Sequence, residues 1–279
     1  MLDITLETLL DTLKLVPFLF IAFLIMEIIE HKLKNSGKEK LNKAGKFGSI
    51  IGAILGAVPQ CGFSVMATNL YATRIISLGT LIAIYLSTSD EMLPILISEG
   101  ASIFTVLTIL LTKIAIGIIA GFLIDLALRK KSKNLEIKDF CENNKCDCEH
   151  GLIKSTIKHT INITLFIFVF SFILHSGLHY LGETRIEKLL LKGNIFSPFL
   201  SSLIGLIPNC ASSVIITELY LNNAISFASC ISGLLTGSGV ALALLFKINK
   251  NLKENIQIIL TLYLIGSLSG VFIEIISLI

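Results

Sequence analysis

The chain contains two copies of one segment, and they align without a gap. Residues 54 to 95 and residues 203 to 244 share 14 identities in 42 positions at a constant offset of 149. Two unrelated membrane segments could share apolar residues by chance, but these identities include residues of other types. They are Gly56/Gly205, Pro59/Pro208, Cys61/Cys210, Ser64/Ser213, Thr68/Thr217, Tyr71/Tyr220 and Ser77/Ser226. A fixed period of this kind indicates a duplicated structural unit. The fold must therefore build one plan twice.

The apolar composition places both copies in a lipid bilayer. Hydrophobic residues make up 53% of the 279 residues, charged residues 15%, and mean hydropathy is +0.83. Several apolar runs approach the about 20 residues that a helix needs to cross a bilayer. No basic region precedes the first run, residues 15 to 29, so we interpret it as a retained helix rather than a signal peptide. The net charge of +3 lies in loops, which argues against a nucleic-acid partner.

Each copy begins with a run too short to cross the membrane. Residues 47 to 58 would form a helix of about 18 Å, against a hydrocarbon core of about 30 Å. Pro59 ends this run, and a second short run, 63 to 73, follows. We predict that 47 to 73 is a re-entrant helical hairpin with Pro59 at its buried tip. The alternatives are a full crossing, or an ordinary helix that Pro59 and Pro208 merely kink.

Lysine-rich loops predict the orientation of the first copy. Residues 31 to 46 hold six lysines against one acid, and Arg129 to Lys133 follow the crossing predicted at 102 to 127. Positive residues favour the cytoplasmic side. Both loops are cytoplasmic if 47 to 73 is a hairpin and 75 to 98 is a single crossing.

An odd number of crossings per copy means that the second copy enters the membrane inverted. Its elements are expected at 160 to 180, 196 to 222, 225 to 246 and 252 to 276, with the lysine-rich turn 247 to 253 inside. The loop 181 to 195, with a net charge of +1, is expected outside against the charge bias. We therefore predict an all-α membrane protein of two inverted-topology repeats, each of about five helical elements, with broken or re-entrant helices meeting near the midplane. The expected divisions are 1–128 for the first repeat, 129–156 for a cytoplasmic linker and 157–279 for the second repeat.

Inverted repeats with broken helices are typical of secondary transporters, because a break exposes backbone groups to a ligand. The chain also resembles the ten-transmembrane heavy-metal exporter family, whose members carry names taken from arsenic permeases or manganese transporters. The motifs of the resemblance, which spans nearly the whole chain, are Pro59-Gln60-Cys61-Gly62, Thr88-Ser89-Asp90-Glu91, Pro208-Asn209-Cys210 and Thr236-Gly237-Ser238-Gly239. Ten passes would count each hairpin arm as one. The resemblance implies metal export but leaves the ion open.

The duplicated tips supply the first candidate ligands. Cys61 and Cys210 lie at equivalent tips, where thiolates could bind a soft ion such as arsenite, zinc or cadmium. Buried cysteines that only pack are the alternative. Oxygen ligands could come from Gln60, Asn209, Ser64, Ser213, Thr68 and Thr217, unless these side chains only cap the helix ends.

Two carboxylates supply the second candidate site. Asp90 and Glu91 lie within a predicted crossing, where a charge costs at least about 2.5 to 3.5 kcal/mol and usually faces a pathway or a partner. Gly239 and Val240 replace them in the second copy. Lys113 is the alternative explanation, as the partner in a structural ion pair. Glu218 could also face the cavity.

The remaining candidates are weaker. Cys141, Cys146, Cys148 and His150 could hold a soft metal in the linker, or the linker could be a plain tether. Cys230 could be a third thiol, but core packing is the preferred interpretation. His175 and His179 have metal-ligand spacing, yet solvated histidines are more common. Gly117, Gly121 and Asp125 recur as Gly266, Gly270 and Glu274, which we interpret as close helix packing.

The predicted function is export of a heavy-metal or metalloid ion by a secondary transporter in the cytoplasmic membrane of a prokaryote. The alternative is manganese(II) export through carboxylate and amide oxygens. A thiol oxidoreductase is less expected because no CxxC pair occurs, and a channel would lack saturable coupled flux. No nucleotide-binding motif occurs, so we expect no ATPase within the chain, and transport is expected to run on an ion gradient, with the proton as the candidate, or on a separate partner. We also expect no enzyme activity and no cofactor. The sequence leaves open whether the protein forms a homo-oligomer.

Overall fold

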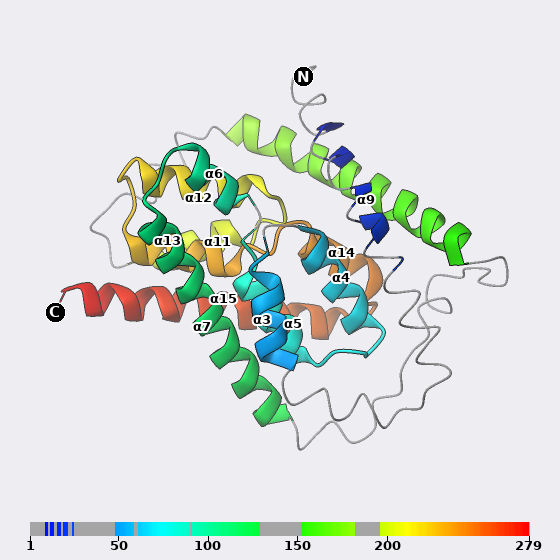
Figure 1. Cartoon of the computed structure of the whole chain (residues 1–279), viewed down its shortest axis with the longest axis horizontal. Helices are drawn as coiled ribbons and strands as arrows, with labels where there is room; N and C mark the ends of the chain where they lie inside the picture. Colours follow the sequence, from blue (N-terminus) through cyan, green and yellow to red (C-terminus); the bar gives the residue numbers. More distant parts are fainter. Residues whose placement is uncertain are drawn as a thin grey trace.

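The computed structural model describes residues 48–58, 61–89, 91–128, 152–181 and 196–278, with scattered positions between 9 and 24. Within these residues every regular element is an α-helix, as predicted for an all-α membrane protein (Figure 1). The first repeat contains α3 (Gly48–Gly56), α4 (Cys61–Ala72), α5 (Leu78–Ser87), α6 (Met92–Ser98) and α7 (Ile103–Leu128). Helix α9 (Leu152–Leu181) begins the second repeat, which also contains α11 (Ser197–Gly205), α12 (Ala211–Leu221), α13 (Phe227–Thr236), α14 (Ala241–Ile248) and α15 (Leu252–Leu278).

The structural repeat follows the sequence offset of 149 closely. The bounds of α3 and α5, moved by 149 residues, coincide with those of α11 and α13. Ser77 and Ser226 are equivalent N-caps whose hydroxyl oxygens accept hydrogen bonds from the third following backbone N–H. The turn before each cap contains one residue with a left-handed backbone, Arg74 (φ 62°) and Asn223 (φ 58°). The two copies therefore share backbone geometry as well as residues.

The first hairpin is re-entrant, because α3 and α5 run side by side in the same direction. Gly48, where α3 begins, packs against Thr80 near the start of α5, and Gly56, where α3 ends, packs against Ser87 at the end of α5. The chain must therefore return along α4 before α5 can begin. The five residues 73–77 span at most about 18 Å, which is too short to make that return without α4.

The second hairpin repeats this geometry. The hydroxyl of Ser229, near the start of α13, donates a hydrogen bond of 2.9 Å to the hydroxyl of Ser197, at the start of α11. Gly205, at the end of α11, packs against the backbone of Gly233 and the hydroxyl of Thr236, at the end of α13. Helix α12 therefore returns to the face from which α11 came.

The crossing that follows each hairpin is broken in the middle. Residues 75 to 98 were expected to form one helix, but α5 ends at Ser87 and α6 begins at Met92. Pro94 has no N–H to donate to the turn before it, which removes a bond that would have bridged the gap. In the second repeat the break contains Gly239 at φ 55°, a conformation that glycine adopts without steric cost.

Contacts between the repeats show that they are inverted. We call the face at which α3 and α5 begin the α3 side; α4 fills the half of the protein between this side and the first tip. Helix α4 packs against α14, the second half of the second broken crossing. At the end of α4, Tyr71 and Arg74 bind Glu254, which lies just beyond α14. Helix α14 therefore ends on the α3 side, so α11 and α13 begin on the opposite face, and α6 packs against α12 as the inversion requires.

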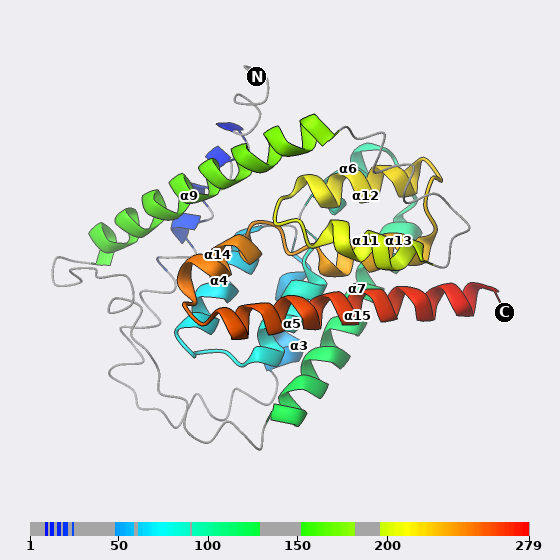
Figure 2. The ribbon, with the colours of Figure 1, turned by 180° about the vertical axis from the view of Figure 1, so that it is seen from behind.

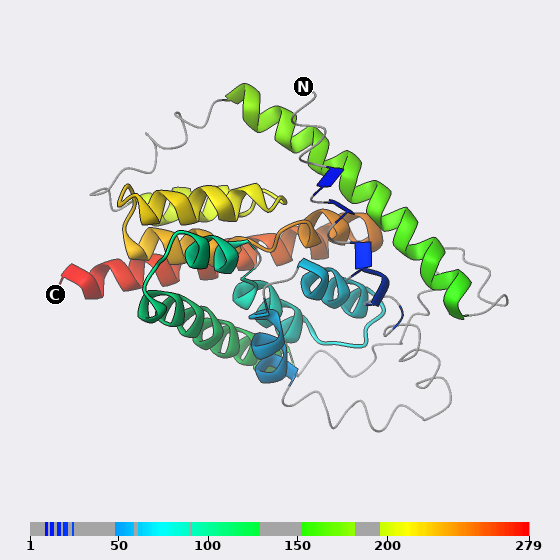
Figure 3. The same ribbon diagram turned by 45° about the horizontal axis from the view of Figure 1, so that its top comes forward.

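The broken crossings form the centre, and the long helices surround them (Figures 2 and 3). The span Phe227–Ile248 is 94% buried, whereas Ile103–Leu128 and Leu252–Ser277 are each 28% buried and expose large apolar side chains. Within the described residues five helical spans are long and apolar enough to cross a membrane. At the same offset α9 corresponds to residues 3–32, whose described positions between 9 and 24 are helical. Lipid therefore faces the outer helices, and the breaks lie inside.

Candidate functional site

Each hairpin tip lies beside the break of its own repeat. Ser89, in the first break, donates a hydrogen bond of 2.6 Å to the carbonyl oxygen of Ala57, directly after α3. In the second repeat, Thr236 donates a bond of 2.8 Å to the carbonyl oxygen of Ser202 in α11. In the first repeat the break is therefore joined directly to the residue after α3, and in the second repeat the helices that lead into the tip and the break are joined to each other.

The tips and breaks of the two repeats lie together at the centre of the protein. Helices α5 and α13, which lead into the two breaks, pack against each other. Lys113, beside the first break, is close enough to Cys230 of α13 for an electrostatic interaction. In Figures 1 and 2 the connections between α11 and α12 and between α13 and α14 lie in the middle of the helical body. Irregular backbone within a membrane is tolerated where protein or a water-filled cavity surrounds it.

A polar stripe leads from each tip toward the surface along the second hairpin arm. Its members recur at spacings of three, four and three residues, which places them on one helical face: Cys61, Ser64, Thr68 and Tyr71 on α4, and Cys210, Ser213, Thr217 and Tyr220 at and along α12. Ser64, Thr68 and Thr217 are at most 1% exposed, and Ser213 is 8% exposed. The repetition of four polar residues with this spacing gives each half of the protein an equivalent polar face.

Hydroxyl groups on the stripes donate to their own helix. Ser213 donates to the carbonyl oxygen of Cys210, and Thr217 donates to that of Ser213, each at 2.7 Å. Thr68 donates to the carbonyl oxygen of Ser64 and accepts from the hydroxyl of Tyr85, 2.6 Å away. The hydroxyl oxygens retain lone pairs, so they can still act as acceptors or cation ligands.

Asn209 carries an unsatisfied donor at the second tip. Its side chain is 4% exposed, and its Nδ2 atom has no hydrogen-bond partner. A buried polar group without a partner costs about 1–3 kcal/mol. The adjacent Cys210 is half-buried and forms no disulfide. The second tip therefore places an amide donor and a thiol next to each other.

The predicted carboxylate site is described only in part. Asp90, Gln60 and Pro59 lie outside the described residues, as do Cys141, Cys146, Cys148 and His150 of the linker. Cys61 is the first residue of α4, but its side chain is outside the description, as are those of His175 and His179 in α9. Glu91 is exposed at the N-terminus of α6, and Glu218 is exposed on α12. Within the described part of the chain, no three histidine, cysteine or acidic side chains gather to form a metal centre.

Lys113 is buried at the first break. Its side chain is 1% exposed, and its Nζ atom donates to the carbonyl oxygen of Thr88. The expected pairing with Asp90 stays a prediction, although Thr88 precedes Asp90 by two residues. Cys230 is fully buried in the hydrophobic core, in keeping with a packing role.

A cluster on the α3 side joins the two repeats, and the sequence analysis did not identify it. Arg74 contacts both carboxylate oxygens of Glu254, with Nη2 to Oε2 at 2.8 Å, and Tyr71 donates its hydroxyl to the same carboxylate. Arg74 also lies over the Tyr71 ring, 5.1 Å from its centroid. The hydrogen bonds to Glu254 raise the pKa of Arg74 above its ordinary value, so it stays charged. The only signal of this contact in the sequence is that Arg74 and Glu254 carry opposite charges and each lies beside a short turn. Because 180 residues separate them, the sequence alone does not pair them.

The recurring acids Asp125 and Glu274 make hydrogen bonds that the sequence did not predict. Asp125 of α7 accepts hydrogen bonds from Ser77 at 2.8 Å and Ser49 at 3.0 Å, and Glu274 of α15 accepts one from Ser226 at 2.7 Å. The repeated pattern around Gly121 and Gly270 does reflect close packing, because an added Cβ would meet Gly79 or Ser232. The recurring acid anchors the outer helix to the cap of the broken helix.

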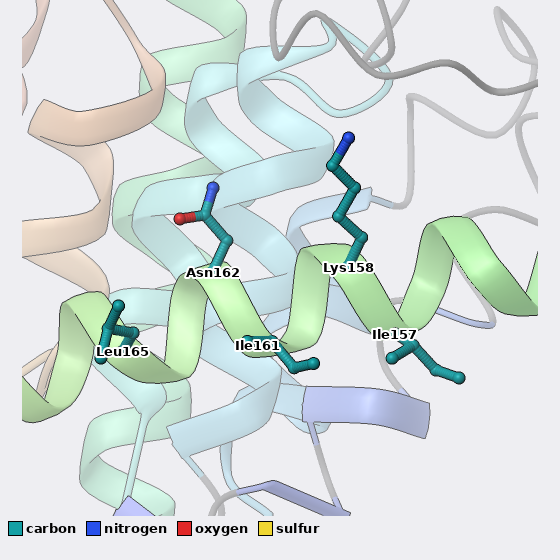
Figure 4. A pocket seen from close by; sticks show the side chains of 5 residues that line it. All are labelled: Ile157, Lys158, Ile161, Asn162 and Leu165. Atoms are coloured by element: carbon teal, nitrogen blue, oxygen red, sulfur yellow. The ribbon is translucent and has the colours of Figure 1, made fainter.

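The surface hollows lie away from this polar region. The larger one, of about 460 Å³, is formed on α9 by Ile157, Lys158, Ile161, Asn162 and Leu165 (Figure 4). Its walls are almost entirely apolar, and none of its residues belongs to a tip or a break. We therefore assign it to the lipid-facing surface rather than to the transport pathway.

Comparison with known proteins gives one family. A family model described as "Putative, 10TM heavy-metal exporter" matches residues 1–161 and again residues 129–265. Neither the curated proteins nor the solved structures contain a significant match to the chain. Each repeat has five passes when each hairpin arm counts as one and each broken crossing counts once; in the second repeat these are α9, α11, α12, the α13–α14 crossing and α15. Two such repeats and the two matched regions agree with ten membrane passes. The chain belongs to the ten-transmembrane heavy-metal exporter family.

Proposed function

We propose that this membrane protein exports a soft heavy-metal or metalloid ion, such as arsenite, zinc or cadmium, by alternating access between its two inverted repeats. The ion is the transported substrate and not a resident cofactor. Its path follows the polar stripe of one hairpin arm to the tips, and then the stripe of the other arm to the opposite face. Inverted repeats meeting at broken helices support this mode of transport.

The observation that carries the proposal is the chemistry of the second tip. A half-buried thiol at Cys210 stands next to the unpartnered amide donor of Asn209, beside the buried break of the same repeat. A thiolate binds soft ions, and an amide N–H can donate to an oxygen of a metalloid hydroxide. Cys61 and Gln60 are proposed to complete the same arrangement at the first tip. Ser64 and Ser213 contribute oxygen atoms from the start of each stripe.

Manganese(II) is the second candidate, and a specific observation favours it. The first break carries Asp90 and Glu91 within the chain segment whose Ser89 and Thr88 are already buried and hydrogen-bonded. Carboxylate, carbonyl and amide oxygens suit manganese better than thiolates do. In the manganese(II) alternative, the ion is bound by Asp90, Glu91, Gln60 and Asn209. The negative charge of Glu218 attracts cations to the second stripe.

The linker and the cell location complete the proposal. Cys141, Cys146, Cys148 and His150 are proposed to capture a soft metal on the cytoplasmic side, between repeats that occupy 1–128 and 157–279. We further propose that the protein lies in the cytoplasmic membrane of a prokaryote. Its partners are lipid and the transported ion, and transport involves no enzymatic step. Coupling uses an ion gradient.

The test is transport in proteoliposomes that contain the purified protein and an indicator for the ion. The variant Cys61→Ser/Cys210→Ser is expected to lose at least tenfold in the rate of cadmium, zinc or arsenite transport. Cys230→Ala is the matched control, because this third cysteine is buried in the core away from solvent. Thermal unfolding of each variant verifies that the fold is retained.

The two candidate ions give opposite results in this test. If the soft ion is the substrate, the double serine variant loses transport and the control does not. If manganese is the substrate, the double serine variant keeps manganese transport and loses little. Unchanged cadmium, zinc and arsenite transport in the double variant would exclude direct thiolate binding.

A further inference from the structure

Lys113 places a positive charge at the point where the first broken helix ends. It lies in the middle of α7, is 1% exposed, and donates from Nζ to the carbonyl oxygen of Thr88, the C-cap of α5. The last carbonyl groups of a helix lack partners within the helix and carry partial negative charge. In transporters with broken helices, such carbonyls hold a coupling cation. In this protein the ammonium group of Lys113 occupies that position at the end of α5.

The second repeat shows that the fold itself does not require this charge. The residue equivalent to Lys113 is Leu262 of α15, which is fully buried. The second broken helix ends at Gly237, whose equivalent in the first repeat is Thr88. The two breaks share their helix bounds, but only the first has an ammonium group against its end. The architecture can therefore be built without an ammonium group at the end of the broken helix.

We propose that Lys113 is the proton-binding residue that couples ion export to the proton gradient. This inference rests on the proposed function, because it names the coupling step of the same transporter. A lysine amine can lose its proton inside a protein, whereas an arginine guanidinium does not. The protonated amine holds the end of α5 through Thr88. A cation that binds next to the break repels the ammonium and drives its proton to water.

The cycle balances one proton against one bound ion. On the cytoplasmic side, the ion binds and Lys113 releases its proton as the neutral amine. On the external side, the ion leaves and Lys113 accepts a proton from the external water, which restores the bond to Thr88. Each exported ion is thereby exchanged for an inward-moving proton, and no sodium ion is needed at the end of α5.

Within the described residues, the helices that pack most closely against α7 carry few titratable groups. Of the helices packed against α7, α13 carries Cys230 and α5 carries Tyr85, while α3 and α6 carry none within their bounds. Tyr85 directs its hydroxyl to Thr68 of α4. Glu91, directly before α6, is exposed, and Asp90 lies outside the described residues. Cys230 is thus the described titratable group that Lys113 influences directly.

The test compares proton release and transport in the full-length protein and its variants. Cadmium and manganese(II) are added to weakly buffered purified protein, and a pH indicator records the protons released per bound ion. Lys113→Gln retains a hydrogen-bond donor for the Thr88 carbonyl but cannot titrate, so it is expected to release about one proton fewer than the wild type. Lys113→Arg keeps the charge and is expected to show the same deficit. Lys253→Gln, an exposed lysine near the start of α15, is the control and is expected to match the wild type.

Proteoliposomes then separate coupling from transport itself. A pH gradient is expected to accelerate cadmium or manganese flux through the wild type at least tenfold and to leave Lys113→Gln unaffected, while both retain downhill exchange. Equal proton release and equal gradient response in the wild type and Lys113→Gln would overturn the coupling role and leave export intact. Absence of flux of either ion through the wild type would instead overturn metal export and the coupling role together.

Discussion

The cluster of Arg74, Tyr71 and Glu254 is expected to hold the α3 side closed. Arg74 and Tyr71 belong to the first repeat and Glu254 to the second, so opening this side must separate them. The perturbation is Glu254→Ala, which removes the carboxylate that both side chains bind. The variant should favour the conformation that is open on the α3 side.

The size of the effect follows from the burial of the pair. An exposed ion pair contributes about 0.2–1 kcal/mol, whereas removing one partner of a fully buried pair costs about 3–5 kcal/mol. Arg74 and Glu254 are each 19% exposed, and the arginine holds both carboxylate oxygens. We therefore assign about 2 kcal/mol to the contact, between these limits. Because 1.4 kcal/mol is a tenfold change, the open population should rise about 30-fold.

The assay measures access to the buried first stripe. In a variant whose native cysteines are serine, Ser64→Cys provides a thiol at a position that is fully buried in this conformation. A membrane-impermeant thiol reagent applied to the α3 side should label it about 30-fold faster after Glu254→Ala. Adding Arg74→Ala should increase the rate little further, since both changes break one contact. Lys253→Gln is the control.

A labelling rate within twofold of the parent would refute the reasoning. It would mean that the pair contributes equally to both conformations, or that the α3 side does not open between α4 and α14. Faster labelling in Lys253→Gln as well would assign the effect to general loosening of the turn before α15.

Three further predictions concern orientation, charge and backbone. A single cysteine at Lys250 should react only with reagent on the cytoplasmic side, and labelling from outside would contradict the lysine-based orientation. Asp90→Asn should abolish ion transport while thermal unfolding stays unchanged; normal transport would reduce this carboxylate to a structural role. Gly239→Ala should lower the unfolding temperature, because φ 55° costs a residue with a Cβ about 1–2 kcal/mol, whereas Gly237→Ala, with φ −74° and no atom within 3.6 Å of the new Cβ, should change it little. Equal losses for the two glycines would exclude backbone strain as the cause.

The sequence was sufficient to predict the duplicated, inverted, all-helical plan, because its signals are local or periodic. Pro59 and Pro208 end short apolar runs, the offset of 149 aligns the two copies, and the lysine-rich loops are all predicted on one face. The break at residues 88–91 was missed, because Leu78–Ser98 has the length and hydropathy of a continuous crossing. Pro94, within that crossing, is the one residue whose type indicates an interrupted helix.

The candidate site was predictable only where residues recur. The stripe from Cys210 through Ser213 follows from the duplication, and so do the equivalent acids Asp125 and Glu274. Contacts between distant segments carry no such signal. The attachment of Glu254 to Arg74 depends on how α14 lies against α4, which no local pattern specifies. The contact of Lys113 with the Thr88 backbone also depends on tertiary packing, because a carbonyl oxygen leaves no trace in the residue type.

The contacts of α4 with α14 and of α6 with α12 also bear on the origin of such a chain. In each pair, an element of one repeat finds its neighbour in the other repeat. A protein consisting of a single repeat would leave both of these elements without that neighbour. It would be complete only as two copies inserted in opposite orientations, so an ancestral half-length chain on this plan would have been an antiparallel dimer before its gene was fused to itself.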